Sequence, residues 1–349
     1  MTLRDPIHEE TDMLNKTLNT LLAATVLAGA SLAAQAADFK ERNLKLSLVV
    51  DRGTAQYDGV ERFAELLRTR SEGKMKLKIF GGGTLGGDLP VLSSLQGGTI
   101  DFTLLNASLL QGNVKEMAIF DMPFLFESAR EADAVVDGPI GRKLLDLLPA
   151  KGLVGLAYWE LGFRNMHNSR RPITRLEDLA GLKMRVIQTP IYLDLLNTLG
   201  ANAVPLPFPE LYTALEQRAV DGATNPPITM QVQKFHEVQK YYSVTNHMYN
   251  PQALLISRKV WDTFTEDEKK LVLEAAAEAR DYQRKVSRQK NAEALETLRK
   301  TLQVNEVAPA EIARMREKAK PVFDKYARQI GEPLVQEMVA EVQKVRAKR

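Results

Sequence analysis

The sequence has 349 residues, and its 47 Lys and Arg residues are nearly balanced by 44 Asp and Glu residues, which gives a formal net charge of +3. Because basic and acidic residues are interspersed along the chain, the charge does not indicate a nucleic-acid-binding protein. The lack of cysteine excludes disulfides, a thiol nucleophile and a lipid-anchored cysteine. The length allows one large domain or two medium domains of about 100–200 residues each.

A secretory leader is predicted over residues 1–36. Lys16 provides its positive charge, residues 21–34 its apolar run, and Ala34-Gln35-Ala36 its cleavage site. Translation from Met13 would remove an acidic segment that fits a leader poorly. The apolar run is shorter than the roughly 20 residues of a membrane-spanning helix. We therefore expect export to the periplasm of a Gram-negative bacterium.

The first part of the expected mature chain alternates strands and helices. Apolar alternation predicts strands over 44–50 and 74–80, and helical spacing predicts a helix over 57–69 between them. A second helix, capped by Asp88, is expected to lead to a strand over 100–105. This order predicts a parallel sheet with crossover helices, so the expected fold class is α/β.

Later segments suggest a repeat followed by long helices. Residues 215–221 follow the pattern of 95–101, since each closes a helix and enters a strand at an aspartate. Either chance similarity or internal symmetry explains so short a match. Asp221-Gly222 is expected to form a turn. From Glu266 onward the spacing predicts long helices that brace the fold and expose their charged faces.

The chain has no recognisable catalytic or cofactor motif. Gly81 to Gly86 spell Gly-x-Gly-x-x-Gly after a strand, but Asp101 begins its strand, whereas a dinucleotide fold needs an acid at the strand's end. Asp88 stands where a phosphate loop needs lysine. No pair among the 4 histidines has metal-ligand spacing. We therefore predict no metal, no cofactor and no catalytic residue, and interpret the glycines as a turn that a small ligand can approach.

Arg185 is a candidate for contact with an anionic ligand. Between residues 182 and 186 apolar residues alternate with Lys183 and Arg185, which predicts a half-buried strand with both cations on one face. A guanidinium suits a carboxylate because its planar donors match two oxygens and it stays charged when water is excluded. The strand alone leaves a purely structural role open, since surface ion pairs are common.

Several motifs resemble those of the solute-binding proteins of tripartite ATP-independent periplasmic (TRAP) transporters. The most specific are Gly-Leu-Lys-Met-Arg-Val at 181–186, Pro-Phe-Pro-Glu-Leu-Tyr-Thr-Ala-Leu at 207–215 and Val-Asp-Gly-Ala-Thr-Asn-Pro at 220–226. Met-Pro-Phe-Leu-Phe at 122–126 is a weaker match. The resemblance covers nearly the whole expected mature chain and agrees with the predicted leader.

The resemblance implies a two-lobed periplasmic-binding-protein fold of the α/β class. Residues 37–162 would form the first lobe and 163–250 the second. Residues 251–349 would return to the first lobe and form long helices across both. A hinge between the lobes would let them close around an organic acid.

The resemblance also implies the ligand contacts. Arg185 would clamp a carboxylate, Arg164 would contact the same ligand, and Asn225 would hydrogen-bond it. Asp88 would accept hydrogen bonds from the hydroxyls of a sugar acid, and Asn106, near Ser108, matches a strand-end position of the other lobe.

Three further positions near these motifs are less specific. Phe208 would form either an apolar wall of the pocket or part of the core. His247 is placed beside Asn246, from where it could reach a ligand. Thr224 departs from the family pattern, because relatives usually carry glutamate there, and this leaves the identity of the ligand open.

We therefore predict an extracytoplasmic receptor, not an enzyme, that binds an organic acid and delivers it to the membrane permease subunits of a TRAP transporter. A uronate or aldonate is favoured because Asp88, Asn106 and Asn225 offer more hydroxyl partners than a dicarboxylate requires. A C4-dicarboxylate would instead use Arg164 and Arg185 on separate carboxylates. We expect a monomer with no nucleic-acid partner.

The alternative prediction is a periplasmic enzyme that acts on hydroxy acids. Asp88 or Glu160 would then serve as its general acid or base. Turnover of a hydroxy acid would distinguish the two, because a receptor leaves its ligand unchanged.

Overall fold

The structure is a computed structural model that describes residues 37–348. The predicted leader lies outside the described residues. The chain divides into two units, Met1–Asp38 and Phe39–Arg349, and every helix and strand discussed below belongs to the second. Among residues 37–348, no helix has both the length and the apolar character needed to cross a bilayer.

A single mixed sheet organises the unit Phe39–Arg349. Within the described residues the sheet has nine strands in the order β2-β1-β3-β8-β4-β7-β5-β6, with β9 beside β8. The strands are β1 (Arg42–Ser47), β2 (Met75–Phe80), β3 (Phe102–Asn106), β4 (Leu153–Asn168), β5 (Lys183–Val186), β6 (Asn202–Pro205), β7 (Gly222–Asn225), β8 (Tyr241–Ser257) and β9 (Gln303–Glu306).

The strand directions divide the sheet into three parts. β2, β1 and β3 are parallel, and so are β7, β5 and β6. Between these two triplets lie the long strands β8 and β4, which are antiparallel to each other and to the adjoining strands β3 and β7. The predicted α/β class is confirmed, and the long antiparallel pair is a feature that the local sequence pattern did not predict.

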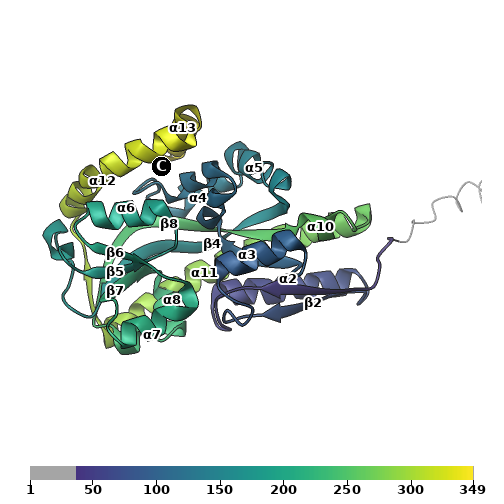
Figure 1. The fold of residues 1–349 in the computed structure, drawn as a ribbon, viewed down its shortest axis with the longest axis horizontal. Coiled ribbons are helices and arrows are strands. Elements are labelled where there is room, and N and C mark those ends of the chain that lie inside the picture. The colour runs from purple at the N-terminus through teal and green to yellow at the C-terminus, as the bar shows by residue number, and fades with distance from the viewer. Residues whose placement is uncertain (1–36, 349) are drawn as a thin grey trace, which may run out of the picture. The chain divides into compact units, whose positions relative to one another are not determined.

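Helices cover both faces of the sheet (Figure 1). One layer contains α2 (Ala55–Arg70), α7 (Leu211–Glu216), α8 (Pro227–Val232), α9 (Phe235–Val238) and α11 (Glu266–Thr301). The other contains α3 (Asp88–Gly97), α4 (Ala129–Val136), α5 (Pro139–Leu145), α6 (Pro190–Thr198), α12 (Pro309–Ile330) and α13 (Glu332–Arg346). The short helix α10 (Arg258–Trp261) follows β8 directly.

Apolar residues on both faces of the central strands join these layers. Along β8, Ala253 and Leu255 pack into the core on the side of α3 and α4, whereas Leu254 and Ile256 pack on the side of α2 and α11. A strand that is buried on both faces reads as a continuous apolar run, which explains the sequence Ala-Leu-Leu-Ile of residues 253–256.

The long helix α11 begins at a well-defined cap. The Thr265 side chain accepts a hydrogen bond from the Glu268 backbone N–H, and the Glu268 carboxylate accepts one from the Thr265 N–H, which is the reciprocal arrangement of a capping box. Glu268 is fully buried and also pairs with Arg42 of β1 at 2.7 Å. The start of α11 is therefore fixed to the first residue of β1, the middle strand of the first triplet.

The short repeat found in the sequence corresponds to two equivalent turns. Asp101 precedes β3, and its carboxylate accepts a hydrogen bond from the Lys45 backbone N–H of β1 at 2.7 Å. Asp221 precedes β7, and its carboxylate accepts one from the Lys183 N–H of β5 at 2.9 Å. Since β3 and β7 also hold corresponding places beside the central pair, internal symmetry explains the match better than chance.

Two local predictions were wrong. Gly87, not Asp88, is the N-cap of α3, and Asp88 is the helix's first residue, whose side chain lines a cavity instead. Asp221-Gly222 is not a turn, because Gly222 begins β7 and the Asp221 carboxylate is held by β5. Both positions are set by contacts with distant segments, which a local residue pattern does not contain.

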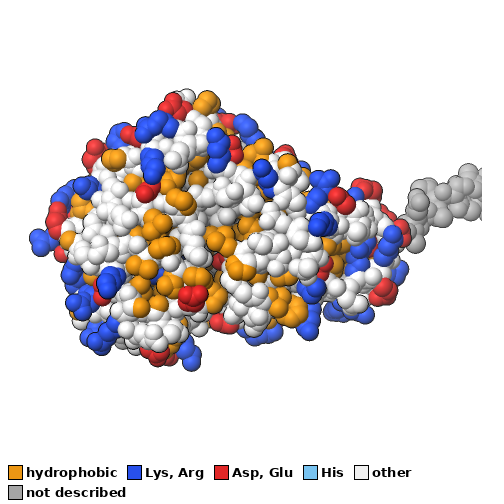
Figure 2. Space-filling view, viewed as in Figure 1, with side chains coloured by type: hydrophobic (Ala, Val, Ile, Leu, Met, Phe, Trp, Pro, Cys, Tyr) orange, Lys and Arg blue, Asp and Glu red, His pale blue; other side chains and the backbone are white. Residues whose placement is uncertain are grey.

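On the face drawn in Figure 2, Lys and Arg side chains lie interspersed with Asp and Glu, and neither sign forms a continuous patch. This agrees with the pattern of charges along the sequence.

Gly222 offers a test of the β4–β7 pairing. A Cβ at this position would lie 2.7 Å from Asn168 Cβ and would press on the His167 carbonyl group of β4. We expect Gly222→Ala to lower the free energy of unfolding by more than about 2 kcal/mol, because the strand must shift to accept it. Thermal and urea unfolding measure this.

Gly97→Ala is the matched control, because nothing lies within 4 Å of a Cβ built at Gly97. It should leave stability unchanged or raise it by up to about 1 kcal/mol, since alanine restricts the unfolded chain. Equal stability of the two variants would contradict the described packing at β7.

Candidate ligand-binding site

A cavity brings together residues from both strand triplets and the central pair. All predicted ligand-binding residues except His247 line it: Asp88, Asn106, Arg164, Arg185, Phe208 and Asn225. Gln252, Thr229 and several apolar residues complete the lining and were not predicted from the sequence. Asn106, Arg185 and Asn225 lie at or near strand ends, where ligands of open α/β sheets bind.

Arg185 enters the cavity from β5 and is only 3% exposed. Its Nε and Nη2 donate to the Leu206 carbonyl at 2.9 and 2.6 Å, which fixes the plane of the guanidinium. Nη1 has no hydrogen-bond partner among the described residues. Burial lowers the pKa of Arg185 to about 9, and repulsion by Arg164 adds to this, while Asp88 opposes it. A carboxylate in the cavity would supply the missing acceptor and the missing negative charge.

Arg164, in β4, is held much more completely. Its Nε donates to the Thr224 hydroxyl at 2.8 Å, its Nη1 to Asn250 Oδ1 at 3.1 Å, and its Nη2 to the Thr224 carbonyl and to Asn225 Oδ1. Burial lowers its pKa. Because most of its N–H groups are engaged, Arg164 has less capacity than Arg185 to bind a ligand directly, but its positive charge remains at the cavity wall.

Asn225 is oriented by a buried histidine. Asn225 Nδ2 lies 3.1 Å from His167 Nε2, and His167 Nδ1 lies 2.8 Å from Gln239 Oε1. A neutral imidazole that donates from Nδ1 to Gln239 and accepts at Nε2 satisfies both contacts. Burial lowers the pKa of His167 to about 3, which agrees with the neutral form. His167 therefore positions the Asn225 amide, a role that its sequence context did not indicate.

Asp88 supplies the negative charge of the cavity lining. The residue is partly exposed, but its carboxyl packs among protein atoms, and burial raises its pKa to about 7 although Arg185 opposes the shift. Near neutral pH this group can therefore accept hydrogen bonds as a carboxylate or donate one as a carboxylic acid.

Asp121 forms a second acidic centre behind the cavity, which sequence reasoning missed. It is fully buried, and its Oδ1 accepts a hydrogen bond from Asn250 Nδ2 at 2.9 Å. The Tyr192 hydroxyl lies 2.9 Å from Asn250 Oδ1, which also accepts from Arg164. Burial raises the pKa of Asp121 to about 7, while Arg164 and these hydrogen bonds oppose the shift. The signal available in the sequence was a lone aspartate within the apolar run of residues 117–126.

His247 does not line the cavity. It is fully buried, its Nδ1 lies 2.7 Å from the Thr245 hydroxyl, and burial lowers its pKa to about 3. The ligand contact expected from its sequence position has no support from this geometry, because the strand β8 turns the side chain into the protein interior.

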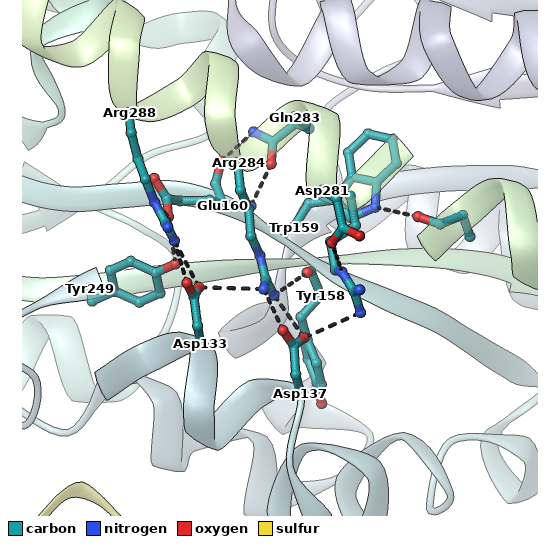
Figure 3. A network of polar contacts seen from close by, with 12 residues as sticks. Asp133, Asp137, Tyr158, Trp159, Glu160, Tyr249, Asp281, Gln283, Arg284 and Arg288 are labelled. Carbon is teal, nitrogen blue, oxygen red and sulfur yellow. Dashed lines mark hydrogen bonds and ion pairs between the residues drawn. The ribbon is translucent and has the colours of Figure 1, made fainter. Parts of the chain in front are cut away.

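Glu160, the other candidate for an enzymatic acid or base, is occupied elsewhere (Figure 3). Its carboxylate accepts hydrogen bonds from Arg288 at 2.8 Å and from the Tyr249 hydroxyl at 3.0 Å. Arg288 also binds Asp133 of α4 at 2.7 Å. Glu160 thus connects the sheet with α11 and α4 and is absent from the cavity lining. Within residues 37–348, no cluster of three or more His, Asp or Glu side chains has the geometry of a metal site.

Residues 46–329 match the family model of bacterial extracellular solute-binding protein family 7. The chain belongs to this family. The predicted resemblance to TRAP solute-binding proteins is confirmed, and proteins of this family bind solutes for transporters and are not enzymes.

Relatives of this family-7 protein include the 2,3-diketo-L-gulonate-binding periplasmic protein YiaO of Escherichia coli, which is 35% identical over 77% of this chain and 82% of its own. A TRAP periplasmic solute-binding protein of Ochrobactrum anthropi is 49% identical, with a TM-score of 0.81 over 89% of this chain and 98% of its own. The sugar acid binding protein DctPAm of Advenella mimigardefordensis, in complex with galactonate, is 42% identical, with a TM-score of 0.87 over 88% of this chain and 100% of its own.

Asp121→Asn tests the buried acidic centre of this family-7 protein. Burial raises the pKa of Asp121 from 3.8 to about 7, so between these values the folded state binds more protons than the unfolded state. The contribution of Asp121 to stability therefore falls as pH rises from about 4 to about 7. Asparagine does not titrate, so the stability of the variant relative to wild type should rise over this window by on the order of 2–4 kcal/mol and then level off.

Urea unfolding between pH 4 and pH 8 measures this difference for the ligand-free protein. Asp262→Asn, at a surface residue with a side-chain exposure of 52%, is the control and should follow wild type at each pH. Parallel curves for wild type and Asp121→Asn would contradict the environment described for Asp121.

Proposed function

We propose that this protein is the receptor of a TRAP transporter for a hydroxylated organic acid, whose carboxylate is held by Arg185. Arg164 of β4 contributes positive charge to the same cavity, and Asp88, Asn106 and Asn225 bind hydroxyl groups. The receptor releases the unchanged acid to the membrane permease subunits of the transporter. A protein exported to the periplasm, as predicted from the leader, would meet such a ligand there.

The incomplete hydrogen bonding of Arg185 carries this proposal. A buried guanidinium is costly unless its donors find acceptors and its charge is compensated. Leu206 accepts from only one edge of Arg185, and no carboxylate of the described residues forms an ion pair with it. A ligand carboxylate would accept from Nη1 and relieve the repulsion between Arg185 and Arg164.

The polar lining supports a sugar acid over a simple carboxylic acid. Asp88 and the amides offer more hydrogen-bonding groups than a single carboxylate uses. The relatives that bind galactonate and 2,3-diketo-L-gulonate agree with this chemistry. A C4-dicarboxylate is the second candidate, since Arg164 and Arg185 are separate cations, but Arg164 has few N–H groups left for a second carboxylate.

Closure on the ligand follows from the same geometry. Asp88, which follows the glycine turn of residues 81–86, lines the cavity, and so does Arg185 of β5. Gly83 in that turn packs against Pro209, with only 2.7 Å between a Cβ built on the glycine and Pro209 Cγ. A ligand that bridges both sides would stabilise this closed arrangement selectively, and opening about a hinge would release it.

Arg185→Lys tests the carboxylate clamp. Lysine keeps the positive charge but loses the planar fork and the bonds to Leu206, so we expect the Kd of the best-binding acid to rise at least about tenfold. Thermal shift with sugar acids, C4-dicarboxylates, 2-oxo acids and aromatic acids identifies that acid through mass-action stabilisation, and calorimetry then gives Kd.

Arg175→Lys is the control, because Arg175 has a side-chain exposure of 67% and pairs only with Asp178 at the surface. Its Kd should equal that of wild type. Binding of no acid in the panel, or equal affinity of Arg185→Lys and wild type, would overturn the proposal. Chemical conversion of any bound acid would favour an enzyme instead.

A further inference from the structure

We propose that Gln252 is a specificity-determining residue that, with Asn106, binds the hydroxyl groups of the ligand and rejects acids that lack them. This inference rests on the proposed function. It identifies the residues of the cavity that contact the part of the ligand other than its carboxylate. Gln252 lies outside the sequence motifs that resemble those of TRAP solute-binding proteins.

Gln252 is an unusual glutamine in this protein. It is 7% exposed and lines the cavity, and its side-chain amide makes no hydrogen bond to any described residue, with Oε1 fully buried. The other glutamines that are deeply buried, Gln56, Gln239 and Gln283, all have hydrogen-bond partners. Native proteins rarely leave a buried amide unpaired, so an unpaired one that faces a cavity points to a partner that the cavity receives.

Asn106 repeats this feature on the neighbouring strand. Asn106 is the last residue of β3, its Oδ1 is buried without a partner, and it lines the same cavity. It lies directly opposite Gln252 in the antiparallel β3–β8 ladder. Residues in such positions have Cβ atoms about 4.5–5.5 Å apart on one face of the sheet. The two amides therefore form a pair of donors and acceptors that can bind adjacent hydroxyl groups.

The strand register places this pair at a suitable distance from the cationic wall. Asn250 accepts a hydrogen bond from Arg164, and Gln252 follows Asn250 by two residues along β8. The separation along the strand is about 7 Å, roughly the length of the carbon chain of a sugar acid. An acid held by its carboxylate near the arginines thus extends toward Gln252 and Asn106.

The discrimination follows from the cost of an unpaired amide. Hydroxyl groups of a sugar acid supply the missing partners, whereas an alkyl chain covers the two amides without pairing them. Sites built in this way reject an analogue that lacks the hydroxyls, because binding it leaves buried polar groups unsatisfied.

The test compares one six-carbon aldonate, galactonate, with hexanoate, which has the same carbon number and carboxylate but no hydroxyls. Calorimetry measures both acids on wild type and on Gln252→Met, whose side chain has similar length but cannot pair with a hydroxyl. We expect the Kd of galactonate to rise about tenfold in the variant, because one or two buried hydrogen bonds are lost. The Kd of hexanoate should change less than about twofold, because hexanoate has no hydroxyl group to bind the amide. Gln252→Leu is measured in parallel, so that a folding defect in one variant does not decide the result.

Gln336→Leu, at an exposed residue of α13, controls for the loss of a glutamine as such. An unchanged Kd for galactonate in Gln252→Met and Gln252→Leu, or an equal loss for both acids, would overturn the inference. Equal affinity of the wild-type protein for hexanoate and galactonate would also overturn the inference. Binding of succinate alone, through Arg185, would do the same. Those outcomes leave the carboxylate clamp standing, whereas binding of no carboxylate by wild type would overturn the proposed function itself.

Discussion

The antiparallel pairing of β4 with β8 is the constraint on which the rest of the structure depends. The pair lies between the two parallel triplets, with β8 beside β3 and β4 beside β7. Their register brings Arg164 of β4 close to Asn250 of β8 and sets Gln252 two residues further along β8. Since a slip of one residue would turn these side chains to the other face, the backbone ladder itself defines the polar wall of the cavity.

The positive charge of the cavity is the second constraint. Arg164 and Arg185 both line the cavity, and the acidic residues of the protein neutralise them only partly. Arg164 and Arg185 are stabilised chiefly by neutral acceptors, the carbonyl groups of Thr224 and Leu206. Asp88 and Asp121 are the acidic groups that act on them, and burial raises the pKa of both toward neutrality. A site of this kind has a deficit of negative charge, and a carboxylate bound there as proposed would remove it and stabilise the folded protein.

Local pattern predicted a parallel sheet and the long helices, because strand alternation and helical spacing are contained in short stretches of sequence. The family motifs predicted most of the cavity's polar residues. Arg185 and Asn225 lie in such motifs. Asn250, Gln252 and Asp121 were missed, since their roles come from pairing between segments far apart in the chain. The same reason explains why the central antiparallel pair was not predicted. It also explains why the prediction of a turn at Asp221-Gly222 was wrong.

Thr224 shows how a departure from a motif can act through a neighbour. The residue is 1% exposed and does not line the cavity, and its hydroxyl and carbonyl groups both accept from Arg164. A glutamate in its place would pair with Arg164 as an anion, whereas threonine satisfies the donors without cancelling the charge. Threonine at this position therefore leaves the positive charge of Arg164 uncancelled, and under the proposed function the choice of ligand would depend on the neighbouring amides of Asn106 and Gln252.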